Sequence, residues 1–407
     1  MTESWKGRRI CMGVWNSMRH DARVARSAGT LVSTEAGVTV VAASWDAAEA
    51  GRAVHDPGFH VITVSRPPPS ALAAGSRGVS LGGALWRLVR AVPSQWRFMG
   101  ALWQSRADIY HAHDLQALPW VWLVAKLRRR PVIYDAHEIS TDRTALQRIG
   151  NTIARIEGFL ARRCEAMIAT TDMRADHFVR QYGVRRPVVL QNRPHFVDVR
   201  RTNRLREALG IPGTAPIVLY QGGMQRGRGL PALVDQIPHL PGAHFVFLGD
   251  GMLKHELETR VRDHGVTDRA HFLPAVPWQE LAEWTASADI GVQLIENTGL
   301  NHYTTDSNKL FEYAMAGLAV VASDFPEIRR IVVAHEFGEL VDPARNEEVH
   351  AALRRLIDDD ALRARYAGNA WNARRELAWE TQAPALIGLY RRLFTSERKP
   401  GVDAHVD

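Results

Sequence analysis

The stretch PIVLYQGGMQRGRGL, residues 216–230, contains a short apolar run, then a turn with four glycines, then the start of a helix. An apolar run of this length predicts a strand that is buried on both faces of a parallel sheet. In such sheets ligands bind at the carboxyl ends of the strands. We therefore expect an α/β fold with a binding site beside residues 222–230.

The same alternation of strand and helix continues along the chain and predicts two doubly wound, Rossmann-like domains that face a cleft. We expect strands in the first half at 8–15, 38–44, 60–65, 108–113, 131–137, 166–171 and 187–192. We expect strands in the second half at 216–223, 244–251, 270–276, 289–295, 318–324 and 338–342. The expected domains are 1–195 and 205–375, followed by a segment, 376–407, whose helix crosses back to the first domain.

Composition favours a folded protein of the cytoplasm. The 407 residues are 46% hydrophobic and 23% charged, and the two cysteines, Cys11 and Cys164, do not suggest a disulfide framework. The N-terminus has no sustained apolar run, so we expect no signal peptide. Residues 1–200 hold 28 Lys and Arg against 16 Asp and Glu, which suggests an anionic partner or only an arginine-rich composition. No recognition motif accompanies this charge, so we do not expect nucleic-acid binding.

The turn GGMQRGRGL, 222–230, is a candidate phosphate site. Gly222 and Gly223 let backbone N–H groups approach a pyrophosphate, and Arg226 and Arg228 add guanidinium donors. The glycine spacing fits neither a GxGxxG fingerprint nor a P-loop. The alternative is a tight strand–helix turn with solvated arginines.

A second candidate is TTDSNKLFEYAMAGLAVVASD, residues 304–324. Asp306 or Ser307 is expected to cap a helix, which directs the N–H groups of its first turn toward the ligand side. Glu312, one turn further on, can accept hydrogen bonds from vicinal ribose hydroxyls. The alternative is that Glu312 only pairs with Lys309 at i, i+3.

The stretches HAHD, 111–114, and DAHE, 135–138, suggest a metal site, but they also fit polar substrate contacts at strand ends. We expect no metal. His113 and Glu138 are the expected contacts to a sugar or an acceptor, and His111 is expected to be structural.

Residues 81–105 interleave tryptophans with arginines. They predict either peripheral contact with an anionic membrane at its inner face or helices that pack on a sheet. Pro93 predicts that this stretch forms two short helices rather than one.

Motifs in both halves resemble the retaining glycosyltransferases of family 4, which adopt the two-domain GT-B fold. They are VLYQGGMQRGRGL and DSNKLFEYAMAGLAVVASDFPEIRRIV in the second half, with ADIYHAHDLQAL and PVIYDAHEIST in the first. The resemblance implies transfer of a sugar, with retention, from a nucleoside diphosphate such as UDP to an acceptor hydroxyl of a glycan, a lipid-linked compound or a small molecule. It implies no cofactor beyond this donor, which the C-terminal domain would bind.

The resemblance also assigns roles to single residues. Glu312 matches the ribose-binding glutamate, Arg228 the phosphate-binding lysine, and His113 the histidine that faces the sugar; Arg228 and His113 are the expected catalytic residues. The backbone of Ala275 and Val276 would hold the base, and Asn16 and Asp21 lie in a loop that meets donor or acceptor. The further donor contacts would be Gly222, Gly223, Arg226, Thr304, Asp306, Ser307, Asn308 and Lys309.

Two positions depart from the family pattern. Thr304 stands eight residues before Glu312, where the family usually has a sugar-binding glutamate. A subgroup with a Lys-x-x-Glu-Tyr core also lacks this glutamate, and this chain resembles that subgroup. Gly223 stands where a phosphate-binding arginine is usual. Two alternatives to a transferase therefore remain: a catalytically silent partner subunit with the same fold, and a nucleotide-sugar epimerase-like enzyme.

Overall fold

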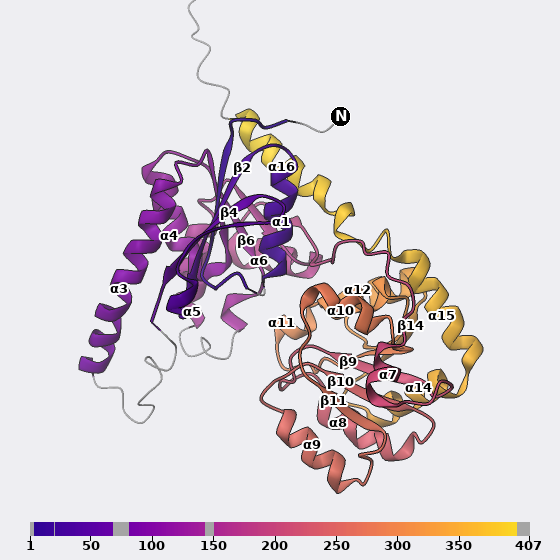
Figure 1. The fold of residues 1–407 in the computed structure, drawn as a ribbon. Helices are drawn as coiled ribbons and strands as arrows, with labels where there is room; N and C mark the ends of the chain where they lie inside the picture. Colours follow the sequence, from indigo (N-terminus) through magenta and orange to yellow (C-terminus); the bar gives the residue numbers. More distant parts are fainter. Residues whose placement is uncertain (1–3, 20, 68–80, 143–149, 397–407) are drawn as a thin grey trace, which may run out of the picture. The chain divides into compact units, whose positions relative to one another are not determined.

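The computed structural model describes residues 4–19, 21–67, 81–142 and 150–396. The chain divides into two compact units (Figure 1). The N-terminal unit comprises Met1–Leu190 and Ala383–Asp407, and the C-terminal unit comprises Gln191–Gln382. Each unit is an α/β domain with its own, mainly parallel sheet.

The N-terminal unit contains an eight-stranded sheet of order β3-β4-β2-β1-β5-β6-β7-β8. Its strands are β1 Arg9–Val14, β2 Gly37–Ser44, β3 Gly51–His55, β4 Phe59–Ser65, β5 Ile109–His113, β6 Val132–Ala136, β7 Ala166–Ala169 and β8 Val188–Val189. All seven strands predicted in this half are confirmed. The unpredicted strand, β3, pairs antiparallel with β4 at the sheet edge, and all its residues are exposed, so it lacks an apolar pattern.

Helices cover both faces of this sheet (Figure 1). They are α1 Ala22–Val32, α3 Leu81–Gln104, α4 Asp114–Leu127, α5 Gly150–Ala161, α6 Asp172–Tyr182 and α16 Ala383–Ser396, with 3₁₀ turns at Ala47–Glu49 and Ser140–Asp142. Residues of α3, α4, α5 and α6 share one core with alternate strand residues such as Tyr110 and Ala112. On the opposite face, α1 and α16 meet the intervening residues, among them His111.

The predicted break at Pro93 is wrong, because α3 continues through this proline as one helix. An internal proline removes one backbone hydrogen bond and costs about 3 kcal/mol in a helix. Phe98 and Leu102, both fully buried on the sheet, hold the helix in place beyond the proline. Side-chain packing therefore overrides the local signal. The expectation for the tryptophans and arginines of 81–105 also concerns Trp86, Arg87 and Arg90. These three lie outside the residues whose side chains the structure describes.

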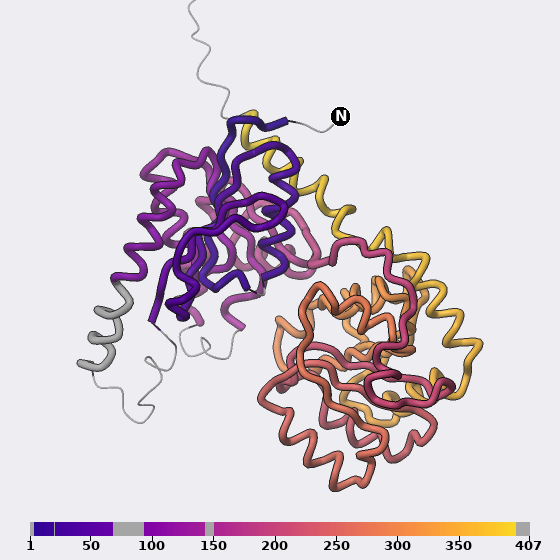
Figure 2. Tube along the Cα trace, in the orientation of Figure 1, coloured from indigo at the N-terminus to yellow at the C-terminus, as the bar shows by residue number. Residues whose placement is uncertain are grey.

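The C-terminal unit contains a six-stranded, parallel sheet of order β11-β10-β9-β12-β13-β14. Figure 2 traces the chain of this unit, coloured by residue number. Its strands, all predicted, are β9 Ile217–Gln221, β10 His244–Leu248, β11 Ala270–Leu273, β12 Ile290–Gln293, β13 Ala319–Ser323 and β14 Gly338–Val341. Its helices are α7 Arg204–Leu209, α8 Leu230–Gln236, α9 Lys254–Asp263, α10 Trp278–Thr285, α11 Leu300–Tyr303, α12 Asn308–Met315, α13 Pro326–His335, α14 Asn346–Asp358 and α15 Asp360–Ala373, with 3₁₀ turns at Ile237–His239 and Trp379–Thr381.

Two cores lie on the two faces of the C-terminal sheet. Val218 and Tyr220 of β9 pack in a core with α8, α9 and α14, whereas Ile217 and Leu219 pack on the other face with α12 and α13. The strand is thus buried on both faces, as its apolar run predicts. Its polar last residue, Gln221, lies where the strand meets the glycine turn.

Candidate functional site

Two glycine turns pack against each other at the carboxyl ends of β9 and β10. The N–H group of Gly222 donates to the carbonyl of Leu248 at 2.8 Å. A Cβ atom on Gly249 would lie 2.2 Å from the carbonyl oxygen of Gly222, and one on Gly251 would lie 2.4 Å from that of Met224. These positions admit only glycine, because both also have positive φ angles. The GDG motif of the second turn, residues 249–251, is predicted as the end of a strand at 244–251, whereas β10 ends at Leu248.

Two cations, Lys309 and Arg228, meet at this turn. A Cβ atom on Gly222 would lie 3.2 Å from Nζ of Lys309, so the ammonium group lies directly against the end of β9. Burial, together with the nearby Arg228 guanidinium, lowers the pKa of Lys309 to about 8. Within the described ranges, neither Lys309 nor Arg228 forms a hydrogen bond or an ion pair, and both side chains are half-buried. The carboxylate of Glu312 lies near Lys309 and offsets part of this charge. Two cations beside one carboxylate still favour the binding of an anion.

Glu312 lies next to these cations and is held by a buried glutamine. Nε2 of Gln221 donates to Oε2 of Glu312 at 2.6 Å, and Oγ1 of Thr285 donates to Oε1 of Gln221 at 2.7 Å. The other oxygen of Glu312 has no partner among the residues that the structure describes. Lys309 is close enough to Glu312 for the carboxylate to raise its pKa, but the hydrogen bond that Glu312 makes is to Gln221. Sequence analysis missed Gln221, which is 91 residues from Glu312.

The neighbouring Tyr313 fixes the helix that carries Glu312. Its hydroxyl lies 3.2 Å from the carbonyl oxygens of Leu219 in β9 and Val292 in β12. The ring fits because β12 has Gly291 beneath it, where a Cβ atom would approach the ring to 2.4 Å. Helix α12 is therefore pinned to the sheet one residue after Glu312.

The start of α12 differs in part from expectation. Ser307 occupies the N-cap position with φ +47°, but its side chain makes no capping hydrogen bond, so the prediction for Ser307 is wrong. Asp306 is buried, and one of its oxygens accepts from Nε2 of Gln191 at 3.0 Å. Thr304 is also buried and donates to the carbonyl of Leu300 within α11 at 2.7 Å. Both side chains are thus engaged by the protein, whereas Asn308 is exposed at the first position of α12.

The remaining predicted donor contacts lie on exposed turns of the same unit. Ala275 is exposed and Val276 half-buried between β11 and α10. Gly223 and Arg226 are exposed on the turn after β9. Of the two arginines on that turn, Arg228 is therefore the one held close to Lys309 and Tyr220.

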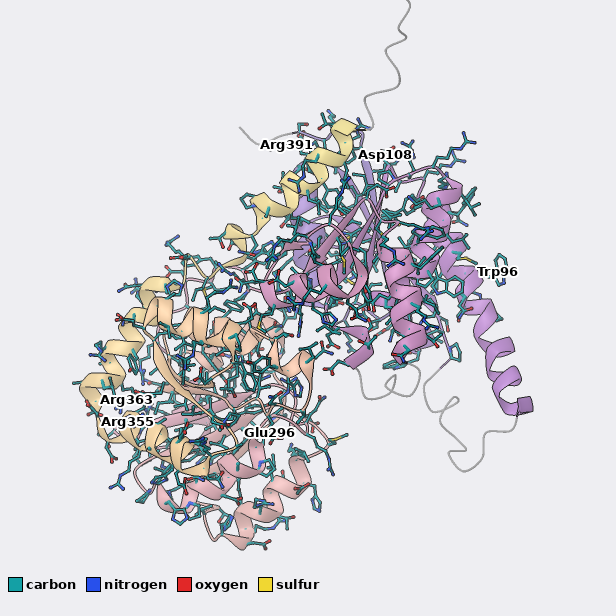
Figure 3. The ribbon with its side chains drawn as sticks, turned by 180° about the vertical axis from the view of Figure 1, so that it is seen from behind. Trp96, Asp108, Glu296, Arg355, Arg363 and Arg391 are labelled. Atoms are coloured by element: carbon teal, nitrogen blue, oxygen red, sulfur yellow. The ribbon has the colours of Figure 1, made fainter. Side chains whose placement is uncertain are left out.

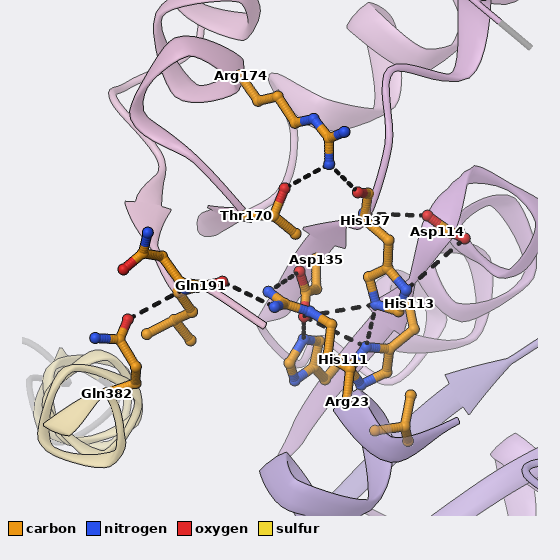
Figure 4. Close-up of polar contacts among 12 residues, drawn as sticks. Arg23, His111, His113, Asp114, Asp135, His137, Thr170, Arg174, Gln191 and Gln382 are labelled. Atoms are coloured by element: carbon orange, nitrogen blue, oxygen red, sulfur yellow. Dashed lines mark hydrogen bonds and ion pairs between the residues drawn. The ribbon is translucent and has the colours of Figure 1, made fainter. Parts of the chain in front are cut away.

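The N-terminal unit carries a polar cluster at the carboxyl ends of β5 and β6 (Figure 4). Nε and Nη2 of Arg23 donate to the two oxygens of Asp135 at 2.9 and 2.8 Å. Nδ1 of His113 lies 3.4 Å from Oδ2 of Asp135 and 3.1 Å from Nε2 of His137. Nδ1 of His111 lies 2.8 Å from the hydroxyl of Tyr390 in α16. His111 and Asp135 are thus joined to the helices that cover this face.

Charge and burial determine the protonation of this cluster. Burial raises the pKa of Asp135, but Arg23 and the histidines outweigh this effect and hold the pKa well below its usual value. Burial lowers the pKa of His113, and it lowers that of His111 further. The cluster at neutral pH is therefore an aspartate–arginine ion pair beside two neutral imidazoles. Nε2 of His113 is buried and has no hydrogen-bond partner among the described residues.

Three potential metal ligands lie together in this cluster. One ligand atom from each of His111, His113 and Asp135 lies within 4.8 Å of the other two. Both oxygens of Asp135 already accept from the Arg23 guanidinium, which would repel a metal cation. The charges around this group therefore fit a metal poorly.

Asn16 and Asp21 lie close to the histidines, whereas Glu138 points to solvent. Oδ2 of Asp21 accepts from Nδ2 of Asn16 at 2.7 Å, and its other oxygen caps α1. Burial raises the pKa of Asp21, but His137, Asn16 and His113 together lower it below its usual value. Glu138 is exposed at the end of β6.

The comparisons with known proteins cover most of the chain. The family model described as "Glycosyl transferase 4-like domain" matches residues 21–194, and "Glycosyl transferases group 1" matches residues 215–359. A D-inositol 3-phosphate glycosyltransferase of Xylanimonas cellulosilytica is 27% identical over 318 residues, which are 72% of this chain and 73% of that protein. A glycogen synthase of Mycobacterium tuberculosis is 25% identical over 307 residues, which are 72% of this chain and 71% of that protein.

Solved structures share the two-domain fold. A sucrose-phosphate synthase from Thermosynechococcus elongatus matches with a TM-score of 0.75 and 17% identity, over 96% of this chain and 100% of that chain. Anabaena Alr3699/HepE, solved in complex with UDP-glucose, matches with a TM-score of 0.72 and 17% identity, over 94% of this chain and 99% of that chain. Among the helices that the structure describes, none has both the length and the apolar character to span a membrane. With a glycosyltransferase family model matched to each unit, the chain is a glycosyltransferase and has the GT-B fold.

Proposed function

We propose that this glycosyltransferase takes its sugar from a nucleoside diphosphate, UDP or a related one, and that the C-terminal unit binds this donor. The observation that carries the proposal is the convergence of two unpaired cations, Lys309 and Arg228, with the half-free carboxylate of Glu312 at one strand end. A diphosphate supplies the anion for the cations, and a ribose supplies two hydroxyl donors for the carboxylate. The solved structure of HepE with UDP-glucose supports this choice of ligand.

The same cations would also assist the reaction. When the bond between the sugar and the diphosphate breaks, negative charge grows on the leaving phosphate. Donors that already point at that phosphate stabilise the transition state, and each contributes about 3–4 kcal/mol in comparable sites. Arg228 and Lys309 can do this without a metal ion, as can the N–H groups of the first turn of α12. Retention of the anomeric configuration is proposed on the family resemblance alone.

In the N-terminal unit, we assign the cluster around His113 to sugar or acceptor hydroxyls. Asp135 is placed to accept a hydrogen bond from the N–H group at Nδ1 of His113, which leaves Nε2 as a hydrogen-bond acceptor for a hydroxyl group. Asn16 and Asp21 border the same histidines and are proposed acceptor contacts. Asp114 supports this assignment, because it follows β5 with φ +62°, a strained conformation that clusters at functional sites.

Steady-state transfer or hydrolysis with a panel of nucleotide sugars tests the proposed donor. We expect turnover of at least one donor, with a strongly raised KM for Glu312→Ala. Glu347→Ala serves as the matched control, because this glutamate is exposed on the first turn of α14. Turnover with an unchanged KM in Glu312→Ala would contradict the ribose assignment. A wild-type protein that neither turns over nor binds any nucleotide would instead indicate the silent partner subunit.

A further inference from the structure

Three helices of the N-terminal unit, α3, α4 and α5, are neighbours (Figure 1). Each of them exposes large apolar side chains to solvent. The exposed side chains have 39–67% of their surface accessible, and they are Trp96, Trp103, Leu123, Leu127, Ile156 and Phe159. Two come from each helix, at spacings of seven, four and three residues that keep each pair on one side of its helix. Trp96 extends away from the unit in Figure 3. We call this surface the aromatic–basic face.

Cations accompany these apolar groups. The guanidinium of Arg128 lies 4.0 Å from the ring centroid of Trp103, and that of Arg163 lies 3.5 Å from the ring of Phe159. Residues 93–104, 114–130 and 150–165 hold eight Lys and Arg against three Asp and Glu. Of the three acids, Glu157 is buried and Glu165 pairs with Lys126 at 2.6 Å. The face is therefore both apolar and positively charged.

The corresponding helices of the C-terminal unit show that this exposure is not a general property of the chain. Helices α8, α9 and α14 carry none of the large exposed apolar side chains found among the described residues. Their charges instead form ion pairs of opposite sign, such as Arg260 with Asp235 and Arg354 with Asp358. Exposed aromatic side chains with unbalanced positive charge are thus concentrated on one helical layer.

We propose that the aromatic–basic face docks the enzyme on an anionic lipid surface. Aromatic rings and arginine stems partition into the headgroup region, while guanidinium groups attract acidic lipids. An acidic protein partner would complement the positive charge of this face. It would not account for six exposed apolar side chains that are spread over three helices. The inference goes beyond sugar transfer and does not depend on the identity of the donor.

Co-sedimentation of the full chain with vesicles tests this docking. We expect binding to phosphatidylcholine vesicles that contain phosphatidylglycerol, weakened by salt, and little binding to phosphatidylcholine alone. Trp96→Ser with Leu127→Ser should weaken binding roughly tenfold, since both side chains are well exposed and removing them leaves the fold intact. Arg97→Glu with Arg129→Glu should weaken it at least as much.

Trp278→Ser is the matched control, because Trp278 is 75% exposed in the C-terminal unit. It should bind the vesicles like the wild type. All variants should keep their thermal melting profile and their activity on a water-soluble acceptor. Equal binding to both kinds of vesicle, no binding to either, or unchanged binding by the variants of the face would overturn the proposal. Salt-sensitive capture by an acidic protein in place of vesicles would also overturn it.

Discussion

The two strand-end sites use charge in opposite ways. At the end of β9, Lys309 and Arg228 approach each other beside a single carboxylate, that of Glu312, so positive charge is in excess. At the ends of β5 and β6, Arg23 and Asp135 neutralise each other inside the protein and hold His113 beside them. The first arrangement is incomplete without an anionic ligand, whereas the second is complete and orients a neutral imidazole. Under the proposed function, the C-terminal unit would supply affinity for the donor, and the N-terminal unit would supply oriented hydrogen bonds.

The largest effect is expected from breaking the neutralised site. Asp135→Ala leaves the guanidinium of Arg23 buried without its carboxylate, which should lower the free energy of unfolding by about 3–5 kcal/mol. Chemical denaturation monitored for the N-terminal unit measures this loss. Asp176→Ala is the control, because its pair with Arg186 is exposed and should change stability by less than about 1 kcal/mol. Equal effects of the two substitutions would refute the contrast between the sites.

Removing a cation from the incomplete site should impair catalysis rather than folding. We expect Arg228→Ala to lower kcat about 100- to 1000-fold, since it removes a donor aimed at the leaving phosphate. Arg226→Ala should have a smaller effect, because this side chain is exposed on the same turn. Rates at saturating donor concentration distinguish the two variants. A larger loss of kcat in Arg226→Ala than in Arg228→Ala would indicate that Arg226, not Arg228, contacts the phosphate.

The substitution Lys309→Met tests, through the thermal stability of the protein, whether positive charge is in excess at the end of β9. The pKa of Lys309 falls from 10.5 to about 8 on folding, so the folded state disfavours its positive charge. This destabilisation is fully present below pH 8 and disappears as the pH rises toward 10.5. At pH 7 the variant should therefore melt at a higher temperature than the ligand-free wild type, yet bind UDP more weakly. A lower melting temperature with unchanged UDP affinity would show that Lys309 is a structural residue.

A smaller effect is expected from Gln221→Leu. The substitution removes the hydrogen bond that orients Glu312 and leaves the carboxylate itself in place. We expect KM for the donor to rise by roughly threefold to tenfold, with kcat little changed. Steady-state kinetics separates the two parameters. A fall in kcat with an unchanged KM would contradict an orienting role for Gln221.

Sequence patterns predict most of the fold because apolar runs mark strands that are buried on both faces. The edge strand β3 escapes this reasoning, since Arg52 and its neighbours are all exposed and held only by pairing with β4. Pro93 led to a wrong prediction of a helix break, because packing of Phe98 and Leu102 on the sheet outweighs the free-energy cost of a proline inside the helix. A sequence pattern of this kind indicates local conformational preference and burial. It does not indicate the tertiary contacts that can override this preference.

The candidate site shows a similar limit. Arg228 is apparent from its place in a glycine turn after a predicted strand, whereas the ribose role of Glu312 is predicted from the family resemblance. Local spacing alone would favour a pair of Glu312 with Lys309. The hydrogen bond between Gln221 and Glu312 is not apparent from the sequence, because it joins residues from two different strand–helix units. Likewise, the ion pair of Arg23 with Asp135 spans 112 residues and gives no local signal. Long-range partners of functional residues therefore required the three-dimensional structure.

The central claim is that Glu312 binds the ribose of a nucleoside diphosphate. Calorimetric titration with UDP and with 2′,3′-dideoxy-UDP tests it most directly, in the wild type and in Glu312→Ala. We predict that the wild type binds UDP at least tenfold more tightly than the dideoxy compound, because two hydrogen bonds to a carboxylate are lost. The Glu312→Ala variant should bind both compounds with nearly equal affinity. The same preference for UDP in both proteins would contradict the claim.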